Sequence, residues 1–592
     1  MKKTLLLALL FLPLLAWKNE DNDAWKKKVD ASLLEKVANG ETASFLILMM
    51  EQADVSDSRK LKTKTEKGAF VFGRLRQTAR QSQAAAIALL EQEKAPYRSF
   101  FIVNIIQSKG GMELIRKVAE LESVAHVQDN PTVKLEEPMP EEGSLDAIGL
   151  RDGLEWGVEK INADDVWAMG YNGQGVVVGG QDTGYEWDHP AIKSKYRGWN
   201  GATADHNYNW HDAIHEISPL HGDSTTDPSL NPCGLDSPVP CDDHNHGTHT
   251  MGTMVGDESD QAKKIGVAPG AHWIACRNME RGYGSPSTYI ECFEWFLAPT
   301  DLNNENPDPS KAPHVINNSW SCPELEGCNP SNFVSMQIAV DNLKAAGVVV
   351  VVSAGNEGSS CSTVNTPAAM LENSFSIGAT MQNDTIAGFS SRGPVLVDGS
   401  GRLKPDVAAP GVGVRSCIRN GGFATYSGTS MAGPHVAGLV ALIISANPAL
   451  AGQVEQIETI IEQTARPMLS NQSCGEFSGM EVPNAVYGYG RVDALAAVMA
   501  ALEVVDDKEV SGGVTVKVLP NPAREQAVIA AEGLEGPAQL RVFALSGQLM
   551  YQSAWAPGQA YETINLNNWP VGIYLYRLAS GGRTWTGKLA KQ

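Results

Sequence analysis

The sequence predicts an α/β fold, a mainly parallel sheet covered by helices, with a smaller unit at each end. Two valine-rich runs over residues 175–180 and 347–352 are typical of strands buried on both faces of a sheet. A helical stretch over 333–346 precedes the second run, as expected where helices connect parallel strands. The length of 592 residues is too great for one domain and indicates about three.

The chain before the sheet divides into a leader and a small α+β unit. In residues 1–16, Lys2 and Lys3 precede an apolar run too short to span a bilayer, which is the pattern of a secretory signal. Residues 17–138 alternate strand and helix patterns, and this order predicts an antiparallel sheet with helices on one face. The expected strands cover 45–50, 100–106 and 124–135, and the expected helices cover 68–93 and 112–121.

The sheet itself is expected within residues 145–502. A charged, Gly-containing linker follows over 503–513. Residues 514–592 then carry short alternating strands separated by turns, which predicts a small β-sandwich. The strands expected there cover 539–543, 561–566, 573–578 and 584–589.

Composition limits the compartment and the partners. The formal charge of −21 argues against nucleic acid as a partner, because such a protein needs a basic face. Nine cysteines fit an exported protein, and their odd number leaves at least one thiol unpaired within a monomer. Disulfides are expected for two close pairs, Cys233 with Cys241 and Cys322 with Cys328, while the pairing of the other cysteines stays open.

A serine at the start of an apolar helical run is the candidate nucleophile of the sequence. Gly428 and Thr429 form a small-residue turn before Ser430, and Pro434 fits the first turn of the helix that follows. A serine nucleophile needs a base beside it and a place for negative charge to develop, and a helix N-terminus supplies the second. Taken alone, the same pattern also describes an ordinary cap on a core helix.

A carboxylate and a histidine cluster precede this serine. Asp182 directly follows the first valine-rich run, where its side chain can be shielded from water. One interpretation takes His246 as the base, with His249 as a hydrogen-bonded helix histidine and His244 as a loop residue. The alternative is a zinc site, because His-x-His-x-x-His approaches the spacing of zinc hydrolases, although Thr248 stands where those sites carry an acidic residue.

Asn356 follows the second valine-rich run within a glycine-rich segment. Its side-chain amide could donate into a cleft as one half of an oxyanion hole, the Ser430 backbone N–H being the other half. Asparagine in a glycine-rich turn is the competing interpretation.

In the order Asp182, His246, Asn356 and Ser430, these motifs resemble the subtilisin-like serine proteases, most closely the bacillopeptidase F-like branch. The resemblance extends over about 350 residues and includes supporting segments such as 389–394 and 404–411. It implies a serine endopeptidase that hydrolyses peptide bonds in protein and peptide substrates. In this family's pattern Ser430 is the nucleophile, His246 the general base and Asp182 the residue that orients it.

The resemblance also places the substrate between two edges of the cleft. Residues 314–321 are similar to the family's substrate-binding strand, and residues 281–285 are similar to the opposite edge. Trp320, Ser321 and Asn365 stand where smaller or more flexible residues are usual, so the cleavage preference stays open. The predicted substrate-binding residues are Gly282, Tyr283, Gly284, Ser319, Trp320, Ser321, Ser353, Ala354, Gly355 and Asn365.

No cofactor is expected for the chemistry, and structural calcium stays open. Ala191 replaces an aspartate that the family's strong calcium site commonly supplies. Residues 205–209 alternate oxygen ligands and Glu216 has a calcium-loop spacing, but Trp210 occupies the position of the loop glycine, so a solvated loop is the favoured interpretation.

The flanking units gain a role from the same resemblance. Residues 17–138 look like the family's inhibitory propeptide, removed by cleavage within 135–139. Residues 514–592 resemble the sorting domain of the type IX secretion system, which implies that secretion machinery is a partner and that the protein is secreted or held at the cell surface. Two other functions remain as alternatives, a zinc hydrolase at the histidine cluster and a catalytically inactive surface binding protein.

Overall fold

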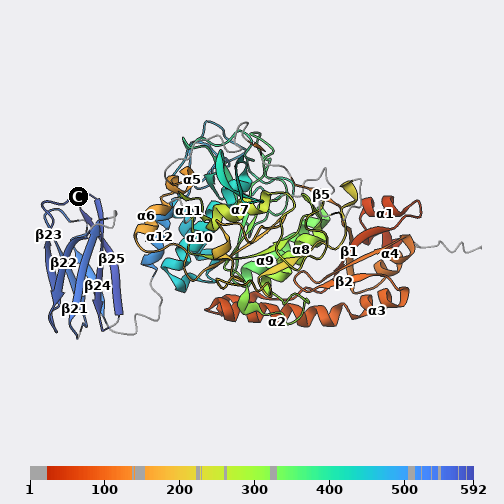
Figure 1. Ribbon diagram of the computed structural model, residues 1–592, viewed down its shortest axis with the longest axis horizontal. Helices are drawn as coiled ribbons and strands as arrows, with labels where there is room; N and C mark the ends of the chain where they lie inside the picture. Colours follow the sequence, from red (N-terminus) through yellow and green to blue (C-terminus); the bar gives the residue numbers. More distant parts are fainter. Residues whose placement is uncertain are drawn as a thin grey trace, which may run out of the picture.

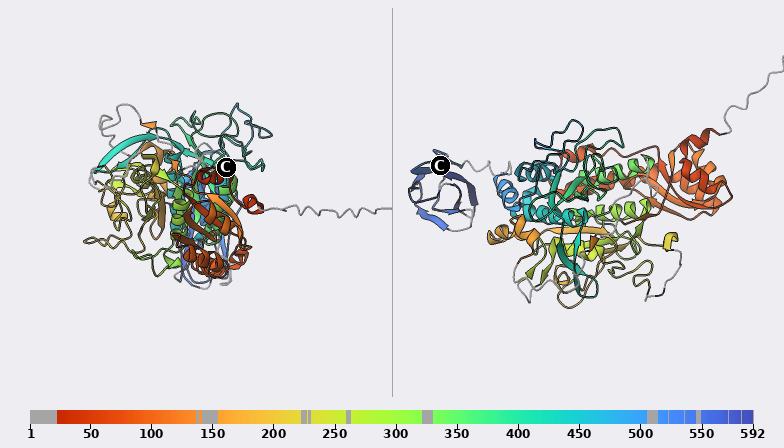
Figure 2. Two further views of the ribbon diagram at one scale, coloured as in Figure 1. Left: turned by 90° about the vertical axis from the view of Figure 1, so that its right-hand side faces the viewer. Right: turned by 90° about the horizontal axis from the view of Figure 1, so that it is seen from above.

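The computed structural model of the chain is elongated, with a smaller unit at each end of a central body (Figure 1). The view from above in Figure 2 agrees that the N-terminal and C-terminal units lie at opposite ends. The predicted signal and most of the predicted linker lie outside the described residues. The structure describes residues 23–135, 139–140, 154–221, 227, 230–258, 263–320, 330–504, 514–521, 523–534, 536–544, 549–570, 572–581 and 583–591.

The N-terminal unit is a four-stranded antiparallel sheet in the order β2-β3-β1-β4, an α+β arrangement as predicted. Alternate side chains of β1 serve two different cores. Phe45 and Ile47 pack with the unit's own helices α1, α3 and α4, whereas Leu46 and Leu48 join a core shared with the central body. The helices are α1 (Ala31–Val37), α2 (Lys64–Ser82), α3 (Ala84–Glu93) and α4 (Met112–Ala119), and the strands are β1 (Ala43–Met49), β2 (Tyr97–Phe100), β3 (Ile105–Gly110) and β4 (Val124–Asp129).

Three elements expected in this unit are wrong in extent. The helix over 68–93 is interrupted at Gln83, whose buried side chain donates to the Phe100 carbonyl at 3.0 Å. The strand expected over 100–106 is broken by a turn at 101–104 between β2 and β3, where Ile102 and Val103 are buried against the central body without sheet pairing. The strand over 124–135 ends at Asp129, and a separate short strand follows it.

The central body is built on a seven-stranded, wholly parallel sheet, which confirms the predicted fold class. Because neighbouring strands run in the same direction, the residues that follow β7, β13 and β14 meet at one edge of the sheet. In spatial order the strands are β16 (Val407–Pro410), β15 (Phe375–Thr380), β14 (Val349–Ser353), β13 (Val315–Asn318), β7 (Val177–Asp182), β11 (His272–Arg277) and β8 (Trp210–Asp212).

Both faces of this sheet are covered by helices. Val351 of β14 belongs to the core beneath α10, and its neighbours Val350 and Val352 belong to the core beneath α8 and α9. The first face carries α5 (Trp156–Lys160), α6 (Ala163–Ala168), α7 (His246–Val255), α10 (Thr429–Ala446), α11 (Val454–Thr464) and α12 (Ala494–Glu503), and the second carries α8 (Pro286–Leu297) and α9 (Pro330–Ala345).

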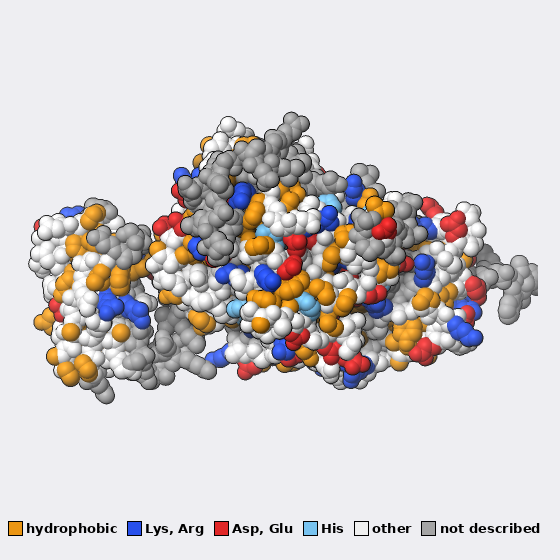
Figure 3. Space-filling model, viewed as in Figure 1, with side chains coloured by type: hydrophobic (Ala, Val, Ile, Leu, Met, Phe, Trp, Pro, Cys, Tyr) orange, Lys and Arg blue, Asp and Glu red, His pale blue; other side chains and the backbone are white. Residues whose placement is uncertain are grey.

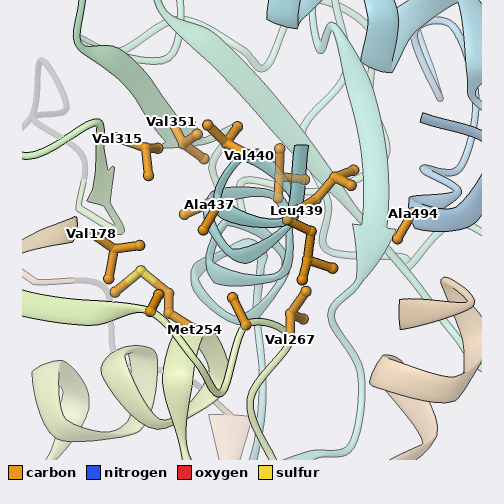
Figure 4. Close-up of a cluster of buried hydrophobic side chains, with 14 of the residues drawn as sticks. Val178, Met254, Val267, Val315, Val351, Ala437, Leu439, Val440 and Ala494 are labelled. Carbon is orange, nitrogen blue, oxygen red and sulfur yellow. The ribbon is translucent and has the colours of Figure 1, made fainter. Parts of the chain in front are cut away.

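Helix α10 is the centre of the larger core. Figure 4 shows its Ala437 and Val440 beside Val178, Val315 and Val351 from three neighbouring strands. The helix is long and apolar enough to cross a membrane by composition alone, but it is almost entirely buried, as expected of a core helix that is apolar all round. Short strands complete the body: β9 (Asp257–Glu258), β10 (Lys263–Lys264), β12 (Tyr283–Gly284), β17 (Val414–Ile418) and β18 (Gly422–Ser427). Two further short strands, β5 (Val133–Lys134) and β6 (Met139–Pro140), precede the body in the chain and pair with β12 and β18.

The C-terminal unit is the predicted β-sandwich, with two antiparallel sheets around one core. All the charged residues in the strands of its four-stranded sheet are basic, and Figure 3 shows basic side chains gathered on this unit. The sequence did not predict β19, β20 or β22. One sheet holds β19 (Thr515–Leu519), β20 (Gln526–Glu532) and β23 (Tyr561–Asn565), and the other holds β22 (Leu549–Trp555), β21 (Ala538–Ala544), β24 (Gly572–Ser580) and β25 (Arg583–Lys591).

Among the described residues, three disulfides cross-link the central body. The predicted pair Cys233–Cys241 is confirmed. Cys276–Cys292 links β11 to α8, and Cys361–Cys474 links the segment after β14 to the segment after α11. The predicted pair Cys322 and Cys328 lies outside the described residues.

Candidate active site

Asp182 and His246 meet at the carboxyl edge of the sheet. Asp182 is the last residue of β7, and His246 is the first residue of α7. The His246 Nδ1 atom lies 2.8 Å from Asp182 Oδ1 and 2.9 Å from Oδ2, and both side chains are fully buried. The other ring nitrogen, Nε2, has no hydrogen-bond partner among the described residues. The carboxylate therefore fixes one nitrogen of the imidazole and leaves the second available.

Ser430 lies in the first turn of α10, which packs against both α7 and β7. The helix begins at Thr429, earlier than the sequence suggested, so Pro434 lies inside it and not in its first turn. Because proline has no N–H, the carbonyl of Ser430 loses its usual donor four residues later. The Ser319 hydroxyl replaces that donor, lying 2.9 Å from the Ser430 carbonyl oxygen.

The Asn356 side chain is fixed by the same helix terminus. Its Oδ1 atom accepts hydrogen bonds from the backbone N–H of Thr429 at 2.8 Å and from the Thr429 hydroxyl at 2.9 Å. These bonds identify the amide oxygen and leave Nδ2 as the outward donor. A Cβ atom built on Gly428 would lie 3.7 Å from both Asn356 Nδ2 and the Ser430 backbone N, so the two donors border the same point.

The edge at residues 281–285 begins with a tight turn. Glu280 N–H donates to the Tyr283 carbonyl at 2.7 Å, and Tyr283 N–H donates back at 3.0 Å. Arg281 and Gly282 between them have φ of 48° and 84°, the pattern of a type I′ hairpin turn. The three residues predicted here, Gly282, Tyr283 and Gly284, therefore form a preformed strand edge.

A strand of the N-terminal unit occupies this edge. Strand β5 pairs antiparallel with β12, with Lys134 opposite Tyr283. The N–H of Leu135 then donates to the Gly282 carbonyl at 2.7 Å. Further along, β6 pairs antiparallel with the end of β18, where Met139 lies opposite Ser427, three residues before Ser430. The described residues before and after 136–138 therefore pair with two different strands of the central body, β12 and β18.

Most of the other predicted substrate-binding residues lie at the ends of β13 and β14, beside the turn that carries Ser430. Ser319, Ser353 and Ala354 are buried, and the Ser353 hydroxyl donates to the Ser319 hydroxyl at 3.3 Å. The N–H of Gly355 donates to the Thr429 hydroxyl at 3.3 Å. Asn365 follows in the segment after β14, where its Nδ2 donates to Glu357 at 3.3 Å. Ser321 lies outside the described residues.

Trp320 is 3% exposed and belongs to the core. Its ring stacks on Tyr289 of α8 with centroids 3.9 Å apart and an interplanar angle of 8°. Val133 and Leu135 of the N-terminal unit are buried in the same cluster. The aromatic pair therefore fills space next to the occupied edge, and its bulk will restrict which side chains fit there.

Contacts that the sequence did not predict hold the N-terminal unit on α8. Glu294 Oε2 accepts hydrogen bonds from the backbone N–H groups of Phe101 and Ile102, the latter at 2.9 Å. Burial raises the pKa of the Glu294 carboxyl to about 8, against the effect of these bonds. Arg98 pairs with Glu291 one turn earlier on the same helix. No sequence signal identifies these residues, because each partner is distant along the chain.

His246 and His249 of the histidine cluster each place one ring nitrogen on a different partner. His246 Nδ1 faces Asp182, and His249 Nε2 donates to the carbonyls of Val414 and Ala424 at 3.1 and 3.2 Å. Burial lowers the pKa of His249 to about 3, so its ring is neutral. Among the residues the structure describes, no group of three or more His, Cys, Asp or Glu side chains is arranged to hold a metal ion.

Comparison with known proteins agrees with this geometry. Residues 173–490, more than half of the chain, match the family described as the subtilase family. The chain belongs to the subtilase family. Its C-terminal residues 517–592 match the family described as the secretion system C-terminal sorting domain. That match indicates a protein that is secreted or held at the cell surface.

Individual relatives cover different shares of this subtilase. Bacillopeptidase F of Bacillus subtilis (strain 168) is 34% identical over 511 residues, 81% of this chain, but the chain spans only 33% of the relative's length. Subtilisin E of the same strain is 28% identical over 423 residues, 71% of this chain and 91% of the relative. A subtilisin of Bacillus pumilus is 31% identical over 315 residues, 53% of this chain and 91% of the relative.

Proposed function

We propose that this subtilase is a secreted serine endopeptidase with Asp182, His246 and Ser430 as its triad. The observation that carries the proposal is the buried Asp182–His246 pair, with Nε2 of the ring left without a partner among the described residues. The Ser430 hydroxyl adds to the scissile carbonyl while His246 Nε2 takes its proton, and the same nitrogen then protonates the departing amine. Asp182 holds the required tautomer and stabilises the imidazolium.

Two donors would receive the negative charge that develops on the carbonyl oxygen. Asn356 Nδ2 and the Ser430 N–H border one point, and the bonds from Thr429 prevent the amide from rotating. Fixed donors of this kind stabilise the transition state without having to reorganise during the reaction. Gly282, Tyr283 and Gly284 would pair with the substrate backbone, and residues 319–321, 353–355 and Asn365 would line its other side.

We further propose that residues 17–138 are an inhibitory propeptide, that 145–502 form the protease and that 514–592 direct export. The pairing of β5 with β12 and of β6 with β18 supports inhibition, because the N-terminal unit then occupies the edge that a substrate needs. Cleavage within residues 135–139 would release the edge. Residues 1–16 would be removed as the signal, and 503–513 would link the protease to its sorting domain.

A mechanism-based label tests the proposal. Exported protein is treated with a fluorophosphonate and mapped by peptide mass spectrometry, and casein hydrolysis is measured with and without a zinc chelator. Label on Ser430, with hydrolysis lost on labelling and unaffected by chelator, is the expected result. Activity that is lost to chelator without any label would assign the site to a zinc hydrolase. An absence of both label and hydrolysis after propeptide removal would identify a binding protein.

Processing supplies a second measurement. In the wild type we expect the protease to cut the segment that connects it to the propeptide. Ser430→Ala lacks the nucleophile, so it should show no hydrolysis and its propeptide should stay attached. Immunoblots of wild type and variant compare the sizes of the exported products. Normal processing of the variant would show that another protease performs the cleavage.

A further inference from the structure

A fully buried arginine connects two carboxylates beside the predicted peptide-binding edge. Arg277 ends β11, and its Nη1 lies 3.4 Å from Asp212 Oδ2 while its Nη2 lies 3.3 Å from Asp243 Oδ2. The Nη2 atom also donates to the Gly234 carbonyl at 2.8 Å. The side chains of Arg277 and Asp243 are both 0% exposed. The group therefore lies inside the protein, where each charge is held by fixed partners.

Asp243 has one contact that Asp212 lacks. Its Oδ1 accepts a hydrogen bond from the backbone N–H of Arg281 at 2.9 Å, whereas Asp212 accepts from Ile214 and Ser237 in a separate loop. Arg281 is the first central residue of the type I′ turn, and its φ of 48° is unusual for a residue with a side chain. The carboxylate thus holds a strained residue in place.

The next residue along this turn carries the peptide-binding carbonyl. Gly282 O accepts the 2.7 Å hydrogen bond from the N–H of Leu135, the residue that follows β5, the strand that occupies the edge. In the other direction, Asp243 lies three residues before His246. One buried side chain therefore connects the loop of the triad histidine to the turn that receives a peptide backbone.

The cost of burying this pair argues for a use beyond stability. Burial raises the pKa of Asp243 to about 7 although Arg277 opposes the shift. Buried ion pairs contribute little net stability, because desolvation offsets their attraction, yet removing one partner is strongly destabilising. Next to the strained Arg281–Gly282 turn, such a pair holds the backbone of the turn in one geometry.

We propose that Asp243 is a positioning residue for substrate binding, which holds the Arg281–Gly282 turn so that Gly282 O can accept a hydrogen bond from the substrate backbone. The proposal rests on the endopeptidase function proposed above. Asp243 acts through the turn and does not touch the reacting atoms. Its loss should weaken the binding of peptides long enough to reach Gly282 and leave shorter substrates unaffected.

Peptide length provides the test. The mature forms of the wild type, Asp243→Ala, Asp243→Asn and Asp212→Asn are compared on a single-residue ester and on a tetrapeptide amide, after the active sites are counted by fluorophosphonate labelling. For Asp243→Ala we expect KM for the tetrapeptide to rise about ten- to a hundredfold, the range for losing a buried hydrogen bond, with kcat nearly unchanged. Its kinetics on the ester should match those of the wild type.

The other two variants separate positioning from general stability. Asp243→Asn keeps an oxygen for the Arg281 N–H and should recover part of the tetrapeptide KM. Asp212→Asn removes the negative charge of the other carboxylate on Arg277 without touching the turn, so it should lower thermal stability and leave the length dependence as in the wild type. If Asp243→Ala yields no labelled protein, the two Asn variants provide the test. A tetrapeptide KM that is higher in Asp243→Asn than in Asp212→Asn then supports the proposal, and equal KM values overturn it.

Two results would overturn different claims. Equal losses on the ester and the tetrapeptide in Asp243→Ala would show that Asp243 supports the fold and not the edge. A wild type that takes no label on Ser430 would instead refute the endopeptidase function on which the inference depends.

Discussion

Glu294 should make the affinity of the N-terminal unit for the protease depend on pH. Its carboxyl is buried beneath that unit and accepts the backbone N–H groups of Phe101 and Ile102. Burial raises its pKa from an ordinary 4.5 to about 8. Because the pKa is higher in the complex, binding takes up a proton. The contribution of Glu294 to the binding affinity is therefore fully present below pH 4.5 and is lost as the pH rises through about 8.

The size of the effect follows from these two values. If the carboxyl has a pKa of 4.5 in the free protease and about 8 in the complex, affinity falls about 50-fold between pH 6 and pH 8 through this group alone. Lys64 titrates in the same window with the opposite sign, because burial lowers its pKa to about 7. The contribution of Glu294 is therefore measured as a difference between the wild type and Glu294→Gln.

The assay is inhibition of the mature protease by added residues 23–135 at pH 6 and pH 8. Glu294→Gln keeps an oxygen for both N–H donors but cannot titrate, so the ratio of the wild-type Ki to the variant Ki should rise about 50-fold over this range. Glu291→Gln is the matched control. Its neighbours His211, His215 and Arg98 hold the pKa of Glu291 well below the usual range against the effect of burial, so its carboxylate stays ionised and its substitution should weaken binding at both pH values. Because Glu291 also raises the pKa of His215, any pH dependence of this control is assigned to that histidine. A wild-type-to-Glu294→Gln ratio that does not change with pH would refute the reasoning.

Two further predictions concern the helix that carries Ser430. Asn356→Ala should lower kcat about 10²- to 10³-fold with little change in KM, the range known for an oxyanion asparagine in subtilisin, and equal losses in binding and turnover would contradict the assignment. Ser319→Ala should lower the free energy of unfolding by about 1–3 kcal/mol, because the buried Ser430 carbonyl loses its donor. In the double variant Ser319→Ala/Pro434→Ala, an N–H is again present four residues after Ser430, so the free energy of unfolding should be about 1 kcal/mol higher than in Ser319→Ala. Denaturant unfolding of the phosphonylated proteins measures it, and strictly additive effects of the two substitutions would show that the two sites are independent.

The parallel sheet was predictable because its signal is local. The runs at 175–180 and 347–352 are apolar throughout, since both faces of β7 and β14 are covered by helices. Asp182 and Asn356 could be predicted to lie together for the same reason, because each follows one of these runs and parallel strands end at one edge. Their roles stay proposals until the variants above are measured.

The apolar run at 100–106 misled for a physical reason. Ile102 and Val103 are as buried as strand residues, but they lie in the turn between β2 and β3 and are buried against α8 and α9, not by sheet pairing. Hydrophobicity reports that a residue is covered and does not report what covers it. An apolar segment at a domain interface therefore has the same composition as a core strand.

Positioning residues are harder to predict than the groups that they position. In the sequence, Asp243 is one member of an acidic pair in a loop, and nothing near it indicates Arg277 or the turn at Arg281. Its function depends on three backbone segments that meet only in the folded chain, at the end of β11, before α7 and before β12. Each group that performs the chemistry can be recognised in a sequence because it lies within a short motif of neighbouring residues. The contacts that orient such a group carry no motif, because any segments that the fold brings together can supply them. For that reason the comparison of Asp243 with Asp212, two carboxylates on one arginine, tests whether the edge is held by a specific contact or only by the rigidity of the core.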